Sequence, residues 1–303
     1  MNTVFEVLTY NILPIFVVAG LGFWLRRYFL VDKQTVSNIV FYALSPCLVF
    51  SSLINSALPV AELGQLAGFT VIFVLALGGL TLVAGRLLRL DRRDTVTLML
   101  VVMFVNSANY GITFSQLRYG DDGVTRAIVY YFTSTVLIFT LGIFIASMGQ
   151  MDARTALRNL LRLPPLYAVA FALLIYGFQV ALPSPLLRAV DIAGAGAIPV
   201  MLLLLGMQMA DMPGWGGMGF IVPAVALRMV VGPLVGFGLA LLMGLDHLGL
   251  AVSVAQAGMP TAVMVIILAT QYDLRPAEVT GTVVITTLAS VISLPLVIYF
   301  FGL

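Results

Sequence analysis

The segment VVMFVNSANYGITFSQLRYG (101–120) decides the fold class of this chain. Its two ends are as apolar as a membrane-crossing helix requires. Its middle holds polar or small residues: Asn106, Ser107, Asn109, Tyr110 and Gly111. Such residues weaken a helix in hydrocarbon and cost desolvation free energy unless they find partners. We therefore expect a transmembrane helix with a bend over 106–111, near the membrane midplane. Interhelical hydrogen bonding and small-residue packing are the alternative role of this cluster.

The composition of the whole chain agrees with a membrane protein. Of its 303 residues, 61% are hydrophobic and 9% are charged, whereas soluble proteins have about 25% charged residues. A soluble globular fold, a disordered chain and a disulfide scaffold are excluded. The net charge of +2 gives no basis for binding nucleic acid, and the single Cys47 cannot form an intramolecular disulfide.

Ten segments are long enough for a helix to cross the hydrocarbon core, which takes about 20 residues. Nine carry no charge, and the tenth contains only Arg228. Their uniform hydrophobicity favours helices over the alternating pattern of a β-barrel. The sequence predicts an all-α polytopic membrane protein with ten transmembrane helices. The windows are 7–25, 34–61, 63–85, 95–117, 127–151, 163–187, 192–210, 212–245, 248–272 and 279–303.

The distribution of Lys and Arg predicts the orientation. Loops after the odd-numbered helices hold eleven of these residues, and the loops on the other side hold three. Because positive loops stay in the cytoplasm, we expect both termini to be extracytoplasmic. The expected location is a cell membrane, such as a bacterial inner membrane, which the chain crosses many times.

Two pairs of residues indicate an internal repeat. Pro46 and Pro199 lie in the second helix of each half, and Tyr119 and Tyr272 close the fourth; both pairs are 153 residues apart. Five helices per half give the halves opposite orientations, as in the inverted repeats of many secondary transporters. We expect a first five-helix repeat over 1–150 and an inverted one over 151–303.

The ninth segment, SVAQAGMPTAVMVIILATQYD (253–273), is the counterpart of the fourth. Pro260 has no N–H and clashes with the carbonyl four residues before it, and Gln256, Met259 and Thr261 lie close to it in the sequence. We expect two broken helices that cross near the midplane. The free N–H groups at half-helix N-termini carry partial positive charge and suit a carboxylate.

Arg228 is the one charge within a predicted span, and such residues are either paired or functional. The sequence leaves two roles open: pairing with backbone carbonyls and attraction of an anionic substrate. Metal-ligand spacings, nucleotide-binding motifs and nucleophile–base pairs are absent from the sequence. We therefore expect no enzymatic activity, no metal and no cofactor.

Several segments together resemble the auxin efflux carrier family, which includes plant PIN-FORMED proteins and bacterial malate or malonate permeases. AQAGMPTAVMVIILATQYDLRPAEVTGTVV (255–284) resembles the family's Gln-Ala-x-x-Pro crossover, and ALRMVVGP (226–233) its Arg-x-x-x-Gly-Pro segment. LLLGMQMA (203–210) and FYALSPCLVFSSL (41–53) are similar to its seventh and second helices. In the fourth helix, Asn106 and Gly111 match the family's Asn and Gly.

The resemblance implies the fold of sodium/proton antiporters and bile-acid symporters. A scaffold domain would hold helices 1, 2, 6 and 7, and a transport domain helices 3–5 and 8–10. It also implies a homodimer and elevator-like movement of a small organic anion, with Asn106 and Pro260 at the crossover. Two features depart from the family: Thr113 replaces a proline, and the third helix has no charge.

The sequence therefore predicts a secondary transporter for a small carboxylate in the lipid bilayer. Hydrogen bonds from Asn106, Asn109 and Thr261 would hold the carboxylate, Ser107 would add a hydroxyl, and Arg228 would supply positive potential. Two alternatives stay open: a Na⁺-coupled organic-anion symporter of the bile-acid type, and a ligand-sensing receptor that does not transport.

Overall fold

The computed structural model describes residues 3–56, 58–148, 161–178, 182–211 and 216–303, with Arg154 and Arg158. Over these ranges the chain is helical, with one isolated antiparallel bridge. Seven helices in them are long and apolar enough to span a membrane. They are Val4–Phe29, Lys33–Ile54, Val60–Leu87, Ser107–Ala146, Ser184–Ala210, Met218–Leu242 and Pro276–Phe301. The protein is therefore a multi-pass membrane protein, and large apolar side chains on its outside, such as Leu242 and Phe300, are exposed as lipid contact requires.

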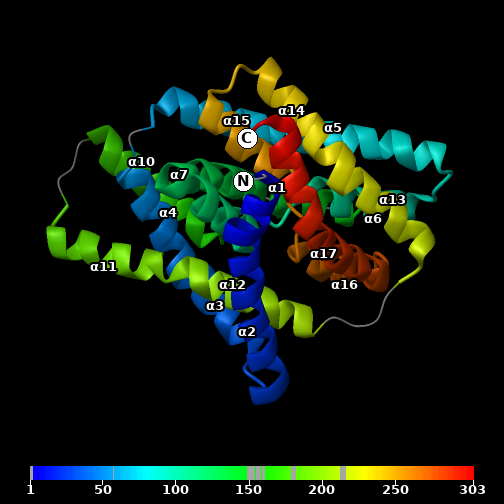
Figure 1. Cartoon of the computed structure of the whole chain (residues 1–303), viewed down its shortest axis with the longest axis horizontal. Helices are drawn as coiled ribbons and strands as arrows, with labels where there is room; N and C mark the ends of the chain where they lie inside the picture. The colour runs from blue at the N-terminus through cyan, green and yellow to red at the C-terminus, as the bar shows by residue number, and fades with distance from the viewer. Residues whose placement is uncertain are drawn as a thin grey trace.

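These spans are built from α-helices, whose arrangement Figure 1 shows, joined by π-helical turns. The first half contains α1 (Thr3–Glu6), η1 (Val7–Ile12), α2 (Leu13–Phe29), α3 (Lys33–Ile39), η2 (Val40–Leu44), α4 (Ser45–Ile54), α5 (Val60–Leu87), α6 (Arg92–Met103), η3 (Ser107–Ile112), α7 (Thr113–Leu137), η4 (Ile138–Gly142) and α8 (Ile143–Ala146). The second half contains α10 (Pro164–Phe178), α11 (Ser184–Ala195), α12 (Ala197–Ala210), α13 (Met218–Ala226), η5 (Leu227–Val231), α14 (Gly232–Leu242), α15 (His247–Ala257), α16 (Met264–Gln271) and α17 (Pro276–Phe301).

Three of the π-helical turns come directly before a proline near the start of the next helix: Pro14, Pro46 and Pro233. A proline ring clashes with the carbonyl four residues earlier. In each case the residue before the proline bonds the carbonyl five residues back instead, as Ser45 N does to Val40 O and Gly232 N to Leu227 O. The wide turn lets each span continue through its proline. It also places Arg228 in η5, just before Pro233.

One predicted helix boundary was wrong. The seventh segment was expected to begin at 192, but α11 begins at Ser184, because Pro183 and Pro185 suit the start of a helix. The end of the fourth predicted helix and the fifth predicted helix together form a 40-residue apolar segment, Ser107–Ala146. A kink at Gly120 divides this segment, and its φ of 67° is a conformation that glycine adopts readily.

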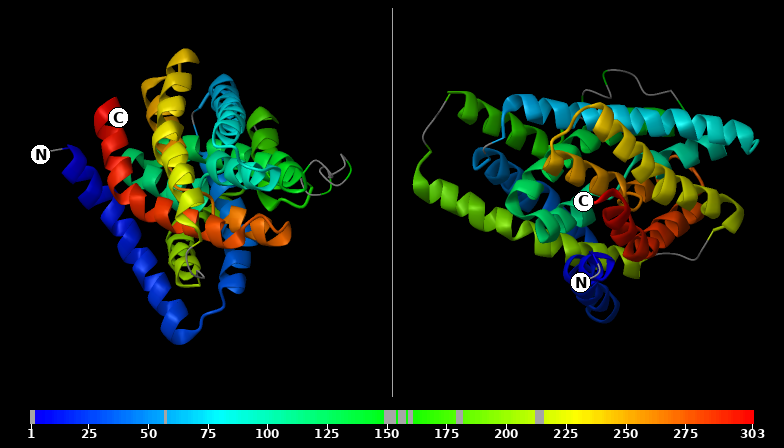
Figure 2. Two further views of the ribbon diagram at one scale, coloured as in Figure 1. Left: turned by 90° about the vertical axis from the view of Figure 1, so that its right-hand side faces the viewer. Right: turned by 45° about the horizontal axis from the view of Figure 1, so that its top comes forward.

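The helices α2 and α12 approach each other closely, and Figure 1 shows them crossing. A Cβ at Gly206 would overlap the carbonyl oxygen of Ala19 on α2. The two backbones therefore touch at this crossing, which only a glycine permits. Elsewhere α1 packs against α17, and Figure 2 shows both termini on the same side of the molecule.

Candidate functional site

Two helices are interrupted, and the interruptions meet. The chain leaves helical conformation between α6 and η3, where Phe104 is extended (φ −108°, ψ 126°), and again between α15 and α16. Asn106 N donates to Pro260 O over 2.8 Å, and Ala262 N donates to Phe104 O over 2.9 Å. Backbone groups freed from both helices thus satisfy each other, as burial in a membrane requires.

The first interruption lies earlier than expected. It was predicted over 106–111, but residues 104–106 form it, and Asn109, Tyr110 and Gly111 lie in the helical turn η3. The extended Val105 pairs with Thr261 in an antiparallel bridge. A β-branched residue suits this extended conformation. The helix is therefore interrupted around Val105, and not within the polar cluster where the interruption was expected.

Arg228 lies where two half-helices end. It is fully buried, and its Nη1 donates to Val102 O on α6 over 2.7 Å. Its Nη2 donates to Ala257 O, the last residue of α15. Helix C-termini carry partial negative charge, so one guanidinium compensates both. Of the two roles that the sequence left open, these contacts favour pairing with carbonyls.

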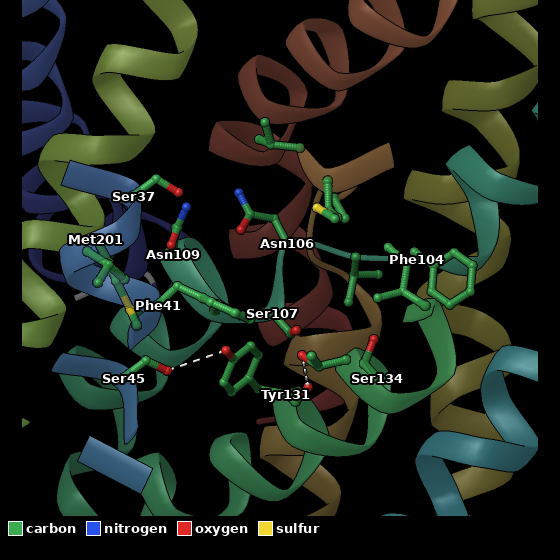
Figure 3. A pocket seen from close by; sticks show the side chains of 18 of the residues that line it. Ser37, Phe41, Ser45, Phe104, Asn106, Ser107, Asn109, Tyr131, Ser134 and Met201 are labelled. Carbon is green, nitrogen blue, oxygen red and sulfur yellow. Dashed lines mark hydrogen bonds between the residues drawn. The ribbon is translucent and has the colours of Figure 1, made fainter. Parts of the chain in front are cut away.

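The crossing also borders a cavity of about 200 Å³ (Figure 3). The starts of η3 and α16 contribute to its lining, and so do the side chains of Asn106, Ser107 and Asn109. Figure 3 shows the Asn106 and Asn109 amides together near Ser37, while Ser107 faces Tyr131 and Ser134. The cavity therefore has an amide end and a hydroxyl end.

Asn106 has the most distinctive position in this cavity. Asn106 is 6% exposed, and its amide Nδ2 has no hydrogen-bond partner among the described residues. A buried donor left unpaired costs about 1–3 kcal/mol. The position is thus ready for a hydrogen-bond acceptor that enters the cavity.

The remaining predicted site residues do not line this cavity. They are Tyr110, Gly111, Gln256, Met259, Pro260 and Thr261. Thr261 donates its hydroxyl to Val101 O over 2.8 Å, and its N–H to the Thr286 hydroxyl over 3.2 Å. Thr261, which was expected to bind substrate, is thus hydrogen-bonded within the protein and fully buried in the crossing.

Three other residues that the sequence singled out contribute to the helix structure. The Tyr110 hydroxyl accepts a hydrogen bond from Ser290 over 3.0 Å. Pro46 and Pro199 both lie in the first turns of helices, α4 and α12, where proline is tolerated.

The sequence reasoning missed lining residues on distant helices. Ser37 and Ser45 belong to the second apolar segment, Gln208 to α12, and Tyr131 and Ser134 to α7. Ser45 Oγ and Tyr131 OH lie 3.3 Å apart. The spacing of Tyr131, Ser134 and Thr135 puts three hydroxyls on one helix face, a signal that could have identified this wall.

The close packing of Gly111 against Gln256 leads to a first prediction. A Cβ at Gly111 would overlap the Gln256 side chain, which is fully buried. We expect Gly111→Ala to lower the thermal unfolding temperature of the purified protein, because overpacking costs about 1–3 kcal/mol. Shortening Gln256 to Ser in the same protein should restore it. Gly79→Ala, where a Cβ meets open space, is the control; equal effects of the two alanines would contradict this packing.

Comparison with known proteins agrees with the membrane-spanning fold. A model of the family described as membrane transport protein matches residues 7–298. A transporter of Methanothermobacter thermautotrophicus without a stated substrate is 25% identical over 95% of this chain and 96% of its own length. A similar transporter of Methanocaldococcus jannaschii is 22% identical over 94% of this chain and 96% of its own length.

Plant proteins match a part of the chain. Auxin efflux carrier component 3a of rice (Oryza sativa subsp. japonica) is 25% identical over 48% of this chain and 24% of its own length. The matched relatives are transporters, and enzymatic activity is not part of the family. The family model covers nearly the entire chain, so the protein belongs to the membrane transport family that includes the auxin efflux carriers.

Proposed function

We propose that this protein is a secondary transporter that carries a small organic anion through its carboxylate group. The unpartnered Asn106 amide in the cavity between the half-helix starts carries this proposal. Helix N-termini attract anions, and η3 continues into α7, so its first turn begins a long helix.

A neutral site suits a carrier. Hydrogen bonds to a charged group contribute about 1.5–3 kcal/mol each, which allows both binding and release. Asn106 and Asn109 would donate amide hydrogens, and Ser107 would donate a hydroxyl. Arg228 binds the carbonyls of the crossing, and the described residues that line the cavity include no Lys or Arg.

The proposed topology has ten spans in two inverted repeats. Each interrupted helix counts as one span, α6 with the part of η3–α7 before Gly120, and α15 with α16. The apolar segment after Gly120 and the helix α10 supply two more. The shared side of both termini, visible in Figure 2, supports an even number of crossings.

The ion pairs support a division into two moving parts. Arg26 and Lys33 both bind Asp211, each over 2.8 Å, and so join the first, second and seventh predicted helices. Arg126 binds Glu62 over 2.7 Å and joins the fifth predicted helix to the third. Each ion pair between described residues stays within the proposed scaffold or within the proposed transport domain. Sliding between the two would therefore leave all of these ion pairs intact.

A second cavity supports alternating access. Its volume is about 570 Å³, and Asp121, Asp122 and Asp191 line it. An apolar cluster lies between the two cavities, with Leu48 and Val124 on the acidic one and Met201 on the other. The acidic cavity would face outside, and the Asn106 cavity would open to the cytoplasm, where positive loops stay.

The uptake of labelled carboxylates tests this function. We expect proteoliposomes with the purified protein to take up radiolabelled malonate, malate or phenylacetate in a saturable way, and protein-free liposomes not to. Replacement of Na⁺ by choline separates the alternatives: uptake that persists excludes a Na⁺-coupled symporter. Binding of a carboxylate without flux would favour a receptor. The proposal would be overturned if the protein neither bound nor transported any of the three carboxylates.

A further inference from the structure

The cavity at the crossing has a smaller neighbour on the basic side of the molecule. This second space has a volume of about 140 Å³. Both cavities are lined by Ser37, Gln208, Val263 and Ile267. The two cavities are therefore neighbours, and together they extend from the amide end around Asn106 to the segment where the second span begins.

Lys33 is the sole cation among the described residues that line the two cavities. It is the first residue of α3, a place where the helix dipole disfavours a cation. Its side chain is 38% exposed, and its Nζ lies 2.8 Å from Asp211 Oδ2. An ion pair with Asp211 would explain structurally why a lysine stands at this position. However, Asp211 is also paired with a second cation.

Arg26 satisfies Asp211 without Lys33. Its Nε donates to Asp211 Oδ1 over 2.8 Å, and its Nη1 also donates to Val31 O. The hydrogen bond from Arg26, followed by that from Lys33, lowers the pKa of Asp211 below its ordinary value. The three groups carry a net charge of +1, so Lys33 can turn to an anion while Asp211 keeps its partner.

Gln208 marks the junction of the two cavities. It lines both of them, and its Oε1 is buried without a hydrogen-bond partner. The Oε1 atom can only accept a hydrogen bond, so the N–H₂ end of the same amide is the part that donates to an anion passing from Lys33 inward.

We propose that Lys33 and Gln208 form a vestibule subsite, which binds the substrate carboxylate before it reaches Asn106. This inference rests on the proposed carboxylate transport and adds residues for capture on the basic side. Lys33 attracts the anion through an exposed charge, and Gln208 receives it within the membrane. Capture by an exposed charge speeds binding and weakens as salt screens it.

Flux kinetics of charge-matched variants test this subsite. The probe is radiolabelled malonate, or malate or phenylacetate where the wild type carries that instead. We expect Lys33→Gln to raise the KM of transport roughly 3–10-fold at about 10 mM salt. The difference should shrink at about 0.15 M salt, where the screening length falls from about 30 Å to about 8 Å. Arg27→Gln removes the same charge from an exposed neighbour that lines neither cavity and should leave KM within about twofold.

A variant of Asp211 separates capture from a structural role. Asp211→Asn frees Lys33, so the subsite predicts a KM that is equal or lower, whereas a purely structural ion pair predicts impairment by both Lys33→Gln and Asp211→Asn. Lys33→Arg keeps the positive charge and should keep the wild-type KM. It replaces Asp211→Asn as the second variant if that protein does not fold. Equal KM values for Lys33→Gln and Arg27→Gln would overturn the subsite. A wild type that carries none of the probes overturns the carboxylate function itself.

Discussion

Replacing Arg228 with methionine is expected to abolish transport and to lower the thermal unfolding temperature of the purified protein. The substitution keeps the length of the side chain but leaves Val102 O and Ala257 O without their donor. Hydrogen bonds from a charged group contribute about 1.5–3 kcal/mol each. The loss is offset in part because a buried cation no longer has to be desolvated. Uptake by proteoliposomes and unfolding in detergent measure the two effects.

Two further variants identify the cause. Arg228→Lys keeps the charge but not the planar fork that reaches two carbonyls, so its stability should lie between those of the wild type and Arg228→Met. Arg86→Gln removes an exposed charge at the end of α5 and should change neither property. An Arg228→Met protein that transports and unfolds like the wild type would show that the half-helix ends need no cation, since apolar side chains can replace buried charges.

Changing Asn106 to aspartate is expected to reduce carboxylate uptake by at least about 100-fold. The two side chains have nearly the same shape, but the unpartnered Nδ2 donor becomes a carboxylate oxygen. The substrate then loses a hydrogen bond and meets a like charge in a buried cavity, and each 1.4 kcal/mol is about a tenfold change in affinity. Initial uptake rates at a fixed substrate concentration measure the loss. Asn106→Ala, which removes the donor without adding charge, should have a smaller effect.

The matched control is Asn38→Asp, which makes the same change on an exposed side chain of α3. It should transport like the wild type. If Asn106→Asp kept normal uptake while remaining folded, the carboxylate would have to bind elsewhere than the amide end of the cavity.

Much of the crossing could be predicted from local signals. Pro260 cannot continue a helix in the usual way, and a cluster of Asn, Ser and Gly in an apolar segment marks a second weak point. The position of the first break could not be predicted in this way. It depends on the pairing of Val105 with Thr261, which are far apart in the chain, and local propensity does not contain such a contact.

The partners of individual site residues were also beyond the sequence. Thr261 was expected to face the substrate, but it bonds Val101 because the crossing brings two separate helices together. Ser37 and Gln208 carry no signal of their own, since single polar residues in a membrane helix are common. Their part in the cavity follows from how α12 packs against η3 and α3, which is a property of the tertiary packing.

The position of Arg228 has a consequence for the membrane potential. A charge that crosses the full potential gains or loses about 2.3 kcal/mol per 100 mV. In a carrier of the proposed kind, Arg228 moves with the crossed segments, and a bound monocarboxylate cancels its charge. The loaded form then crosses with little electrical work, while the return of the empty form is the step that voltage drives or retards.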